Sequence, residues 1–287
     1  MSSPSQADVV ALVKPTLGAI LLGMAFSSAF FGITLLQTYQ YYDRYWNDGL
    51  GLKLFVVIIG ILDTAQLVAV VQSNWWYLIE NYGNVSALTS VEWSLGVEIA
   101  MTCSVGLLVQ MFFAKRVWAL SEKNTVITTL IILTTLTQFS LGIYYTTLGQ
   151  STDFSSIAKI TWASTASLAC SIAGDVIITA SMCFYLHRSR SGMRRTDKLI
   201  NVLIVYTVNT GLLTTICAIC TIILVSILPF ATFTGELIYC KCYVNSTLAS
   251  LNARSRLRSL DRAFLSCIQF VTVDKTQGSD IEETSMA

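Results

Sequence analysis

The sequence has 287 residues, of which 54% are apolar and only 12% are charged. A soluble domain has about twice that share of charged residues to cover its surface, so the composition excludes an ordinary soluble domain and indicates an integral membrane protein. The formal net charge of +1 gives no reason to expect a nucleic-acid partner.

Seven stretches are apolar enough to cross a bilayer as helices, because about 20 residues cover a hydrocarbon core of about 30 Å. A short segment, residues 1–15, precedes them. The first apolar run is longer than that of a typical signal peptide, so we expect it to remain as a span. The sequence predicts an all-α bundle of seven transmembrane helices, at residues 16–37, 52–71, 93–113, 125–148, 160–185, 199–225 and 229–251.

The positive residues predict the direction of the spans. Fifteen of the 18 lysine and arginine residues lie in the loops after spans one, three and five and in the C-terminal tail, whereas Lys14 and Lys159 lie on the other side. Since positive residues mark cytosolic loops, we expect the N-terminus outside and the C-terminus in the cytosol. The alternation favours seven spans over six, the alternative if the weakly apolar last stretch does not cross.

Several features outside the hydrocarbon core suggest modification. Asn84 begins the sequon Asn-Val-Ser in a loop expected outside the cell and is a glycosylation candidate. Residues 252–271 are expected to form a basic amphipathic helix on the cytosolic leaflet, in which Cys267 is a palmitoylation candidate. An acidic tail, residues 272–287, is expected to be disordered.

The cysteine and histidine residues give little sign of chemistry. Seven of the eight cysteines lie in apolar runs, which argues against a disulfide framework. Cys217 and Cys220 form a CxxC inside a span, where packing is a commoner role than metal binding. With a single histidine, His187, we expect no metal site, and no catalytic constellation suggests an enzyme.

Five ionisable residues lie inside the expected spans, where each costs about 2.5–3.5 kcal/mol and is therefore usually paired or functional. Lys241 is the only cation among them and lies near the midplane, as Asp63 does. We expect Lys241 to pair with Asp63 or Asp175, either as a salt bridge that fixes helix register or as part of a cavity for a ligand or an ion. Glu98 and Glu236 lie nearer the outer face; acids without a cation would be protonated or face water.

Two asparagines complete the candidate cavity. Asn209 lies at mid-depth in span six, and Asn245 lies four residues after Lys241 in span seven. Asn245 also begins a sequon, but its position inside the last span predicts that it stays unmodified.

Local signatures separate the chain from two other seven-span classes. Span three ends in MFFAKRVWAL without the Asp-Arg-Tyr of G-protein-coupled receptors, and span seven lacks their Asn-Pro-x-x-Tyr. Lys241 occupies the span that carries the retinal-linking lysine of microbial rhodopsins. The acid expected one turn earlier is absent, because Glu236 is five residues back, so retinal on Lys241 is disfavoured and no cofactor is expected.

Three long blocks resemble a known family: LGMAFSSAFFGITLLQTYQYYDRYWND, RRTDKLINVLIVYTVNTGLLTT and KCYVNSTLASLNARSRLR. They are similar to recurrent blocks of a seven-transmembrane family, abundant in mushroom-forming fungi, that carries a domain of unknown function. The resemblance extends from about Pro15 to Arg258. It implies a seven-helix bundle in a fungal membrane but no ligand or activity.

These observations lead to three functional hypotheses for a multi-pass protein of the plasma membrane. The first is a receptor- or sensor-like bundle with an intramembrane polar cavity. The alternatives are a small-solute or proton-coupled transporter that uses the same acids, and a structural or scaffold protein without a ligand. Besides the lipid bilayer, the expected partners are a cytosolic protein or anionic lipid at the basic segments 188–198 and 254–262.

Overall fold

The computed structural model describes residues 6–84, 90–151, 160–189, 194–227 and 235–253, and within these ranges it is helical without any strand. The elements are α1 (Gln6–Arg44), α2 (Leu50–Trp75), the π-helical turn η1 (Trp76–Glu80), α3 (Trp93–Leu120), α4 (Thr125–Ser151), α6 (Thr161–Arg188), α7 (Arg194–Ile227) and a last helical stretch at residues 235–253. Short turns at residues 45–49 and 121–124 connect α1 to α2 and α3 to α4.

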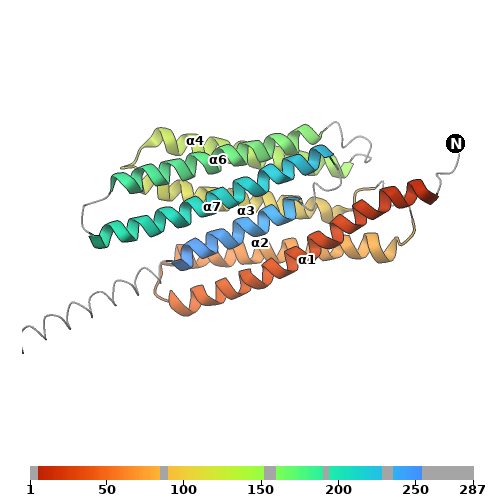
Figure 1. Ribbon diagram of the computed structural model, residues 1–287, viewed down its shortest axis with the longest axis horizontal. Helices are drawn as coiled ribbons and strands as arrows, with labels where there is room; N and C mark the ends of the chain where they lie inside the picture. Colours follow the sequence, from red (N-terminus) through yellow and green to blue (C-terminus); the bar gives the residue numbers. More distant parts are fainter. Residues whose placement is uncertain (1–5, 85–89, 152–159, 190–193, 228–234, 254–287) are drawn as a thin grey trace, which may run out of the picture.

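The helices lie side by side along the long axis of the molecule, and successive helices run in opposite directions (Figure 1). α1 begins at one end of the bundle, and the last helical stretch, drawn in blue, ends at the other. Neighbours in the sequence pack on one another from α1 to α4, and α6 contacts α3, α4 and α7. This up-and-down arrangement is typical of helical membrane proteins whose connections are short.

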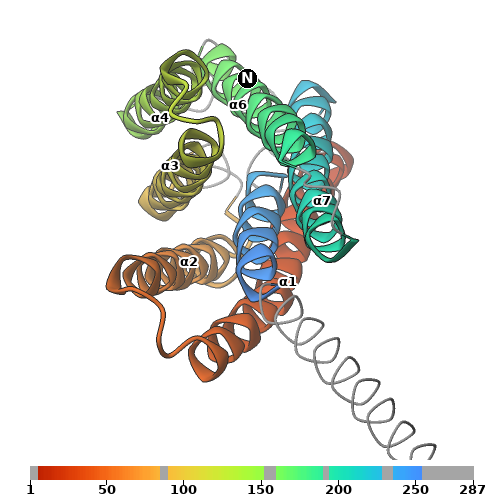
Figure 2. The ribbon, with the colours of Figure 1, turned by 90° about the vertical axis from the view of Figure 1, so that its left-hand side faces the viewer.

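The last helical stretch, residues 235–253, occupies the centre of the bundle, and we call it the central helix. Figure 2, which looks along the bundle, shows this blue helix with the other helices around it. Fifteen of its 19 residues are buried and none is exposed. The least apolar of the seven expected spans is therefore the one with the least contact with lipid, which explains how it tolerates polar side chains.

Apolar side chains lie on the surface and polar side chains lie in the interior, which is the reverse of their distribution in a soluble protein. Large apolar side chains are exposed along the helices, among them Leu22, Ile61 and Leu133. Several Asp, Glu, Lys and Gln side chains are buried, among them Asp63, Lys241 and Gln110. A surface of this kind fits a hydrocarbon solvent, and five helical segments are long and apolar enough to cross it: Leu17–Arg44, Leu50–Glu80, Trp93–Leu120, Thr125–Gln150 and Thr161–Arg188. In α7 the described apolar stretch is shorter, Thr207–Ile223.

The helices extend beyond the expected spans. α1 continues to Arg44 rather than ending at residue 37, and α3 continues from residue 113 to Leu120. Hydropathy detects only the part of a helix that matches the hydrocarbon core, whereas backbone hydrogen bonding continues into the polar interface. The helices are therefore longer than the predicted spans, whose own boundaries stay a prediction.

Some sequence predictions lie outside the described residues: the amphipathic helix with Cys267, the basic segment 254–262, the acidic tail and most of the basic loop after α6. Asn84 is described and exposed, directly after Gly83, whose φ of +77° ends the turn that follows η1. Its accessibility is compatible with glycosylation, which stays a prediction.

Candidate functional site

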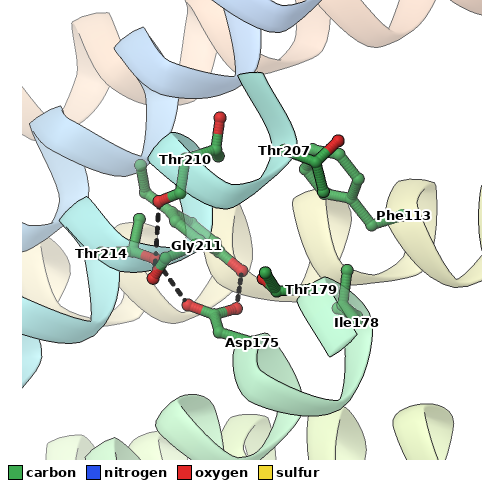
Figure 3. Close-up of a pocket in the computed structure, with 9 residues that line it drawn as sticks. Phe113, Asp175, Ile178, Thr179, Thr207, Thr210, Gly211 and Thr214 are labelled. Carbon is green, nitrogen blue, oxygen red and sulfur yellow. Dashed lines mark hydrogen bonds between the residues drawn. The ribbon is translucent and has the colours of Figure 1, made fainter. Parts of the chain in front are cut away.

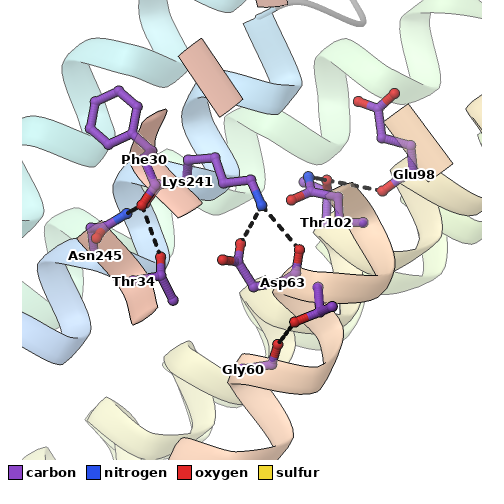
Figure 4. A network of polar contacts seen from close by, with 10 residues as sticks. Phe30, Thr34, Gly60, Asp63, Glu98, Thr102, Lys241 and Asn245 are labelled. Atoms are coloured by element: carbon purple, nitrogen blue, oxygen red, sulfur yellow. Dashed lines mark hydrogen bonds and ion pairs between the residues drawn. The ribbon is translucent and has the colours of Figure 1, made fainter. Parts of the chain in front are cut away.

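An ion pair joins the central helix to α2 in the middle of the bundle (Figure 4). The Nζ atom of Lys241 lies 2.6 Å from the Oδ1 atom of Asp63, and both side chains are completely buried. Lys241 also donates a 3.1 Å hydrogen bond to the backbone carbonyl of Asp63. The structure thus selects Asp63 from the two partners that the sequence left open.

The surroundings of the ion pair are polar but incompletely bonded. The Oδ2 atom of Asp63 has no hydrogen-bond partner among the described residues. One turn along α2, Gln66 donates a 2.8 Å hydrogen bond to the hydroxyl of Thr102 on α3. That hydroxyl donates in turn to the backbone carbonyl of Glu98. These bonds hold α2 against α3 and so fix the position of Asp63.

A second buried carboxylate, Asp175 of α6, is held by neutral donors alone (Figure 3). Tyr243 of the central helix donates a 2.7 Å hydrogen bond to Oδ1, and Thr214 of α7 donates a 2.8 Å hydrogen bond to Oδ2. Gln110 of α3 adds a 3.2 Å bond to Oδ1. We call these four residues the Asp175 cluster; it joins four helices around one carboxyl group.

Close packing of α6 and α7 positions this cluster. A Cβ atom on Gly211 of α7 would collide with the side chain of Thr179 of α6, so only glycine permits this approach. Thr214, three residues later, reaches Asp175 because the two backbones are so near. Beside the cluster lies a cavity of about 10 Å³, which is about the space that one water molecule needs.

Tyr239 and Ser171 extend the hydrogen bonds of the Asp175 cluster further through the core. The hydroxyls of Tyr239 and Ser171 lie 2.5 Å apart, and Gln110 lies 3.4 Å from the Ser171 Oγ atom. The rings of Tyr239 and Tyr243 are stacked with centroids 5.5 Å apart. A chain of hydrogen bonds therefore leads from Tyr239 through Ser171 and Gln110 to Asp175.

Glu236 and Glu98 form a second acidic region, which we call the Glu98–Glu236 pair. The Oε1 atom of Glu236 accepts a 3.1 Å hydrogen bond from Ser164 of α6. The Oε2 atom of Glu236 and the Oε1 atom of Glu98 have no partner among the described residues. Both side chains are buried, and the charge of Glu236 acts on the carboxyl of Glu98.

The space beside Glu236 is small. A cavity of about 20 Å³ is lined by Glu236, Ser164, Gln138 and residues of α3 and α4, and the Oε1 atom of Gln138 also has no partner in the described part of the chain. Sites for organic ligands measure about 300–1,000 Å³. This polar core has room for water, a proton or a small ion, and the described residues hold no group of three or more metal-ligating side chains.

Two of the predicted cavity residues have other positions. Asn209 is exposed on α7, so its placement in the core was wrong. The inward face of α7 carries Thr207, Thr210 and Thr214 instead, and a helix turns residue 209 about 100° away from its neighbour 210. Asn245 is buried, but its amide donates to the backbone carbonyls of Phe30 and Lys241 rather than to an acid, so it ties the central helix to α1.

Sequence reasoning missed the neutral members of the core. Gln110, Thr214, Tyr239 and Tyr243 were not selected, although they bond Asp175 or Ser171. A signal was present on α7, where threonines recur at residues 207, 210, 214 and 221 with helical spacing. The two tyrosines, four residues apart, likewise share one face of the central helix.

The comparisons with known proteins agree with this description. The family of unknown function DUF6534 matches residues 171–256, which include Asp175, Thr214 and Lys241 but not Asp63 or Glu98. No curated protein matches the chain. The fold, the lipid-compatible surface and this match define a multi-pass helical membrane protein that carries a domain of unknown function.

Proposed function

We propose that the protein is a sensor-like bundle of seven transmembrane helices that responds to protons taken up by its buried acids. In this proposal it lies in the plasma membrane with its N-terminus outside, as the distribution of positive residues suggests. The opposite positions of the start of α1 and the end of the central helix support an odd number of crossings (Figure 1). The carrying observation is the Glu98–Glu236 pair, in which each acid has one buried carboxyl oxygen without a donor among the described residues.

The physical reason is the cost of negative charge in an apolar interior. Two ionised carboxylates buried within electrostatic reach of each other repel, and a buried oxygen without a donor adds a further penalty. A bound proton removes one charge and supplies a donor at the same time. The titratable or charged groups around the pair are Lys241, Tyr239 and Cys240 of the central helix, Cys103 of α3 and Tyr145 of α4.

The central helix offers a route from proton uptake to a cytosolic response. Glu236, Lys241 and Tyr243 lie on this one helix and contact α6, α2 and α6 respectively. A change of charge at Glu236 therefore acts on an element that is bonded to both α2 and α6. We propose that the response leaves through the cytosolic ends of these helices and the basic segment 188–198.

Infrared difference spectroscopy tests proton uptake directly. For the full chain in phosphatidylcholine vesicles, a change from neutral to mildly acidic pH should produce the carbonyl band of a protonated carboxyl group. Glu98→Gln or Glu236→Gln should remove most of this band, whereas Glu80→Gln, at an exposed position, should leave it unchanged. A wild-type protein without the band would show that the acids only stabilise the bundle, as in a scaffold.

Proton-coupled transport is the second candidate, favoured because Glu98 interacts electrostatically with both Glu236 and Lys241, and Lys241 pairs with Asp63. The two functions differ in flux. Vesicles that contain a pH-sensitive dye should show no proton movement across the membrane if the protein is a sensor. Flux that collapses in Asp63→Asn would instead assign transport.

A further inference from the structure

We infer that a groove between α2 and α3 binds an anionic phospholipid of the bilayer. The groove has a volume of about 690 Å³, within the range of about 300–1,000 Å³ found for sites of small ligands. It lies at the end of the bundle where α2 begins and α3 ends, away from the buried acids. Its lining residues are Gly49, Gly51, Leu52, Phe55, Leu108, Met111, Phe112, Lys115, Arg116, Ala119 and Leu251.

The length of the groove matches one leaflet. On α3 the lining residues form two rows with a spacing of four, one from Leu108 through Phe112 to Arg116 and one from Met111 through Lys115 to Ala119. From residue 108 to 119 the helix rises about 16 Å, at about 1.5 Å per residue. Half of a hydrocarbon core is about 15 Å. An acyl chain that lies along this groove would extend from the interface to near the midplane.

The walls suit an acyl chain. The rings of Phe55 and Phe112 stack with centroids 4.5 Å apart and join the two helices across the groove. Buried Leu251 of the central helix also lines it. Met111 is 40% exposed, so this side of α3 is accessible to lipid. At Gly49 and Gly51 an added Cβ atom would meet nothing within 4 Å, so the glycines leave the mouth open.

The charge of the groove selects the headgroup. Lys115 and Arg116 lie at its interfacial end, and none of the described residues that line it is acidic. The Arg116 guanidinium lies 5.6 Å from the ring centroid of Phe112, so its position is restricted. Two positive charges above an apolar slot complement a negatively charged headgroup with its chain, and basic pockets between transmembrane helices at the cytosolic side commonly bind such lipids.

Native mass spectrometry of the detergent-purified full chain tests the charge. Titration with phosphatidylglycerol should give a saturable bound lipid, and phosphatidylcholine at the same concentration should bind more weakly. Lys115→Gln with Arg116→Gln should weaken phosphatidylglycerol binding about five-fold for each charge removed, hence about 25-fold together. Lys123→Gln, an exposed lysine at the same end of α3, should leave binding unchanged. Equal loss in this control would show non-specific attraction and overturn the inference.

A steric variant tests the groove without a change of charge. Gly51→Leu should occupy the open mouth and reduce phosphatidylglycerol binding, because its new side chain enters free space on the acyl path. Gly32→Leu on α1, where a Cβ atom also meets nothing within 4 Å, is the matched control and should bind lipid as the wild type does. The far-ultraviolet circular dichroism of both variants reports folding. Folded Gly51→Leu with unchanged lipid binding would exclude the groove as the site.

Discussion

Asp63 and Asp175 are the same residue type, buried in the same bundle, yet their surroundings neutralise them differently. Asp63 faces a buried ammonium group 2.6 Å away, and one of its oxygens has no other partner among the described residues. Asp175 receives hydrogen bonds from a phenol, a hydroxyl and an amide, which come from three different helices. Asp63 is stabilised by one opposite charge, whereas Asp175 is stabilised by several hydrogen-bond donors that each contribute little.

The comparison teaches what each region can tolerate. Loss of either partner of the ion pair leaves a buried charge without its direct counter-ion. Loss of the charge at Asp175 leaves neutral donors that remain bonded to a neutral acceptor. Removal of one partner should therefore abolish the stabilisation by the Asp63 ion pair completely. Removal of one group from the Asp175 cluster should reduce the stabilisation only in part.

The largest expected effect comes from Asp63→Asn. It leaves the Lys241 ammonium buried without a counter-ion, so the free energy of unfolding in detergent should fall by about 3–5 kcal/mol. Asp63→Leu combined with Lys241→Met removes both charges and should recover most of that loss. Circular dichroism during denaturant titration measures both variants. An equally unstable double variant would mean that packing rather than charge explains the loss.

A smaller effect is expected for Asp175→Asn, about 1–2 kcal/mol, because the amide still accepts hydrogen bonds from Tyr243 or Thr214. Tyr243→Phe, which removes a single donor, should cost about 1 kcal/mol. The same denaturant titration gives both values. The distinction between the two regions would fail if Asp175→Asn proved as damaging as Asp63→Asn.

The smallest effect should follow from Asn209→Leu. Its side chain is exposed on α7, so the free energy of unfolding should change by less than about 0.5 kcal/mol. Thr214→Val on the inward face of the same helix removes a donor to Asp175 and should cost about 1 kcal/mol. A large loss in Asn209→Leu would contradict the orientation of α7 and with it the assignment of the Asp175 cluster.

Much of the fold could be predicted from the sequence. Apolar length alone located the helices, and the cost of charge in lipid singled out Lys241 and the acids as interior residues. Which acid would pair with Lys241 could not be predicted, because hydropathy does not specify how each helix is rotated or which neighbours it meets. Packing decides both, through close contacts such as that of Gly211 with Thr179.

The neutral part of the core was the least predictable. Gln110 is a single amide in an apolar helix, and nothing in its immediate sequence shows that it will meet Asp175, 65 residues away. Asn209 was chosen on depth alone, although only rotation about the helix axis distinguishes it from Thr210. The depth of a residue in the membrane follows from its position along the chain. The direction in which its side chain points requires knowledge of the partner helices.

The central helix follows the other described helices along the chain, and this order has a consequence for biogenesis. Chains are made from the N-terminus, so the helix that fills the middle is synthesised only after the six helices that enclose it. Until residue 241 leaves the ribosome, Asp63 is in the nascent chain without its counter-ion. A chain stopped before residue 235 would have an unfilled polar interior, and quality-control proteases of the membrane should remove it faster than the complete protein.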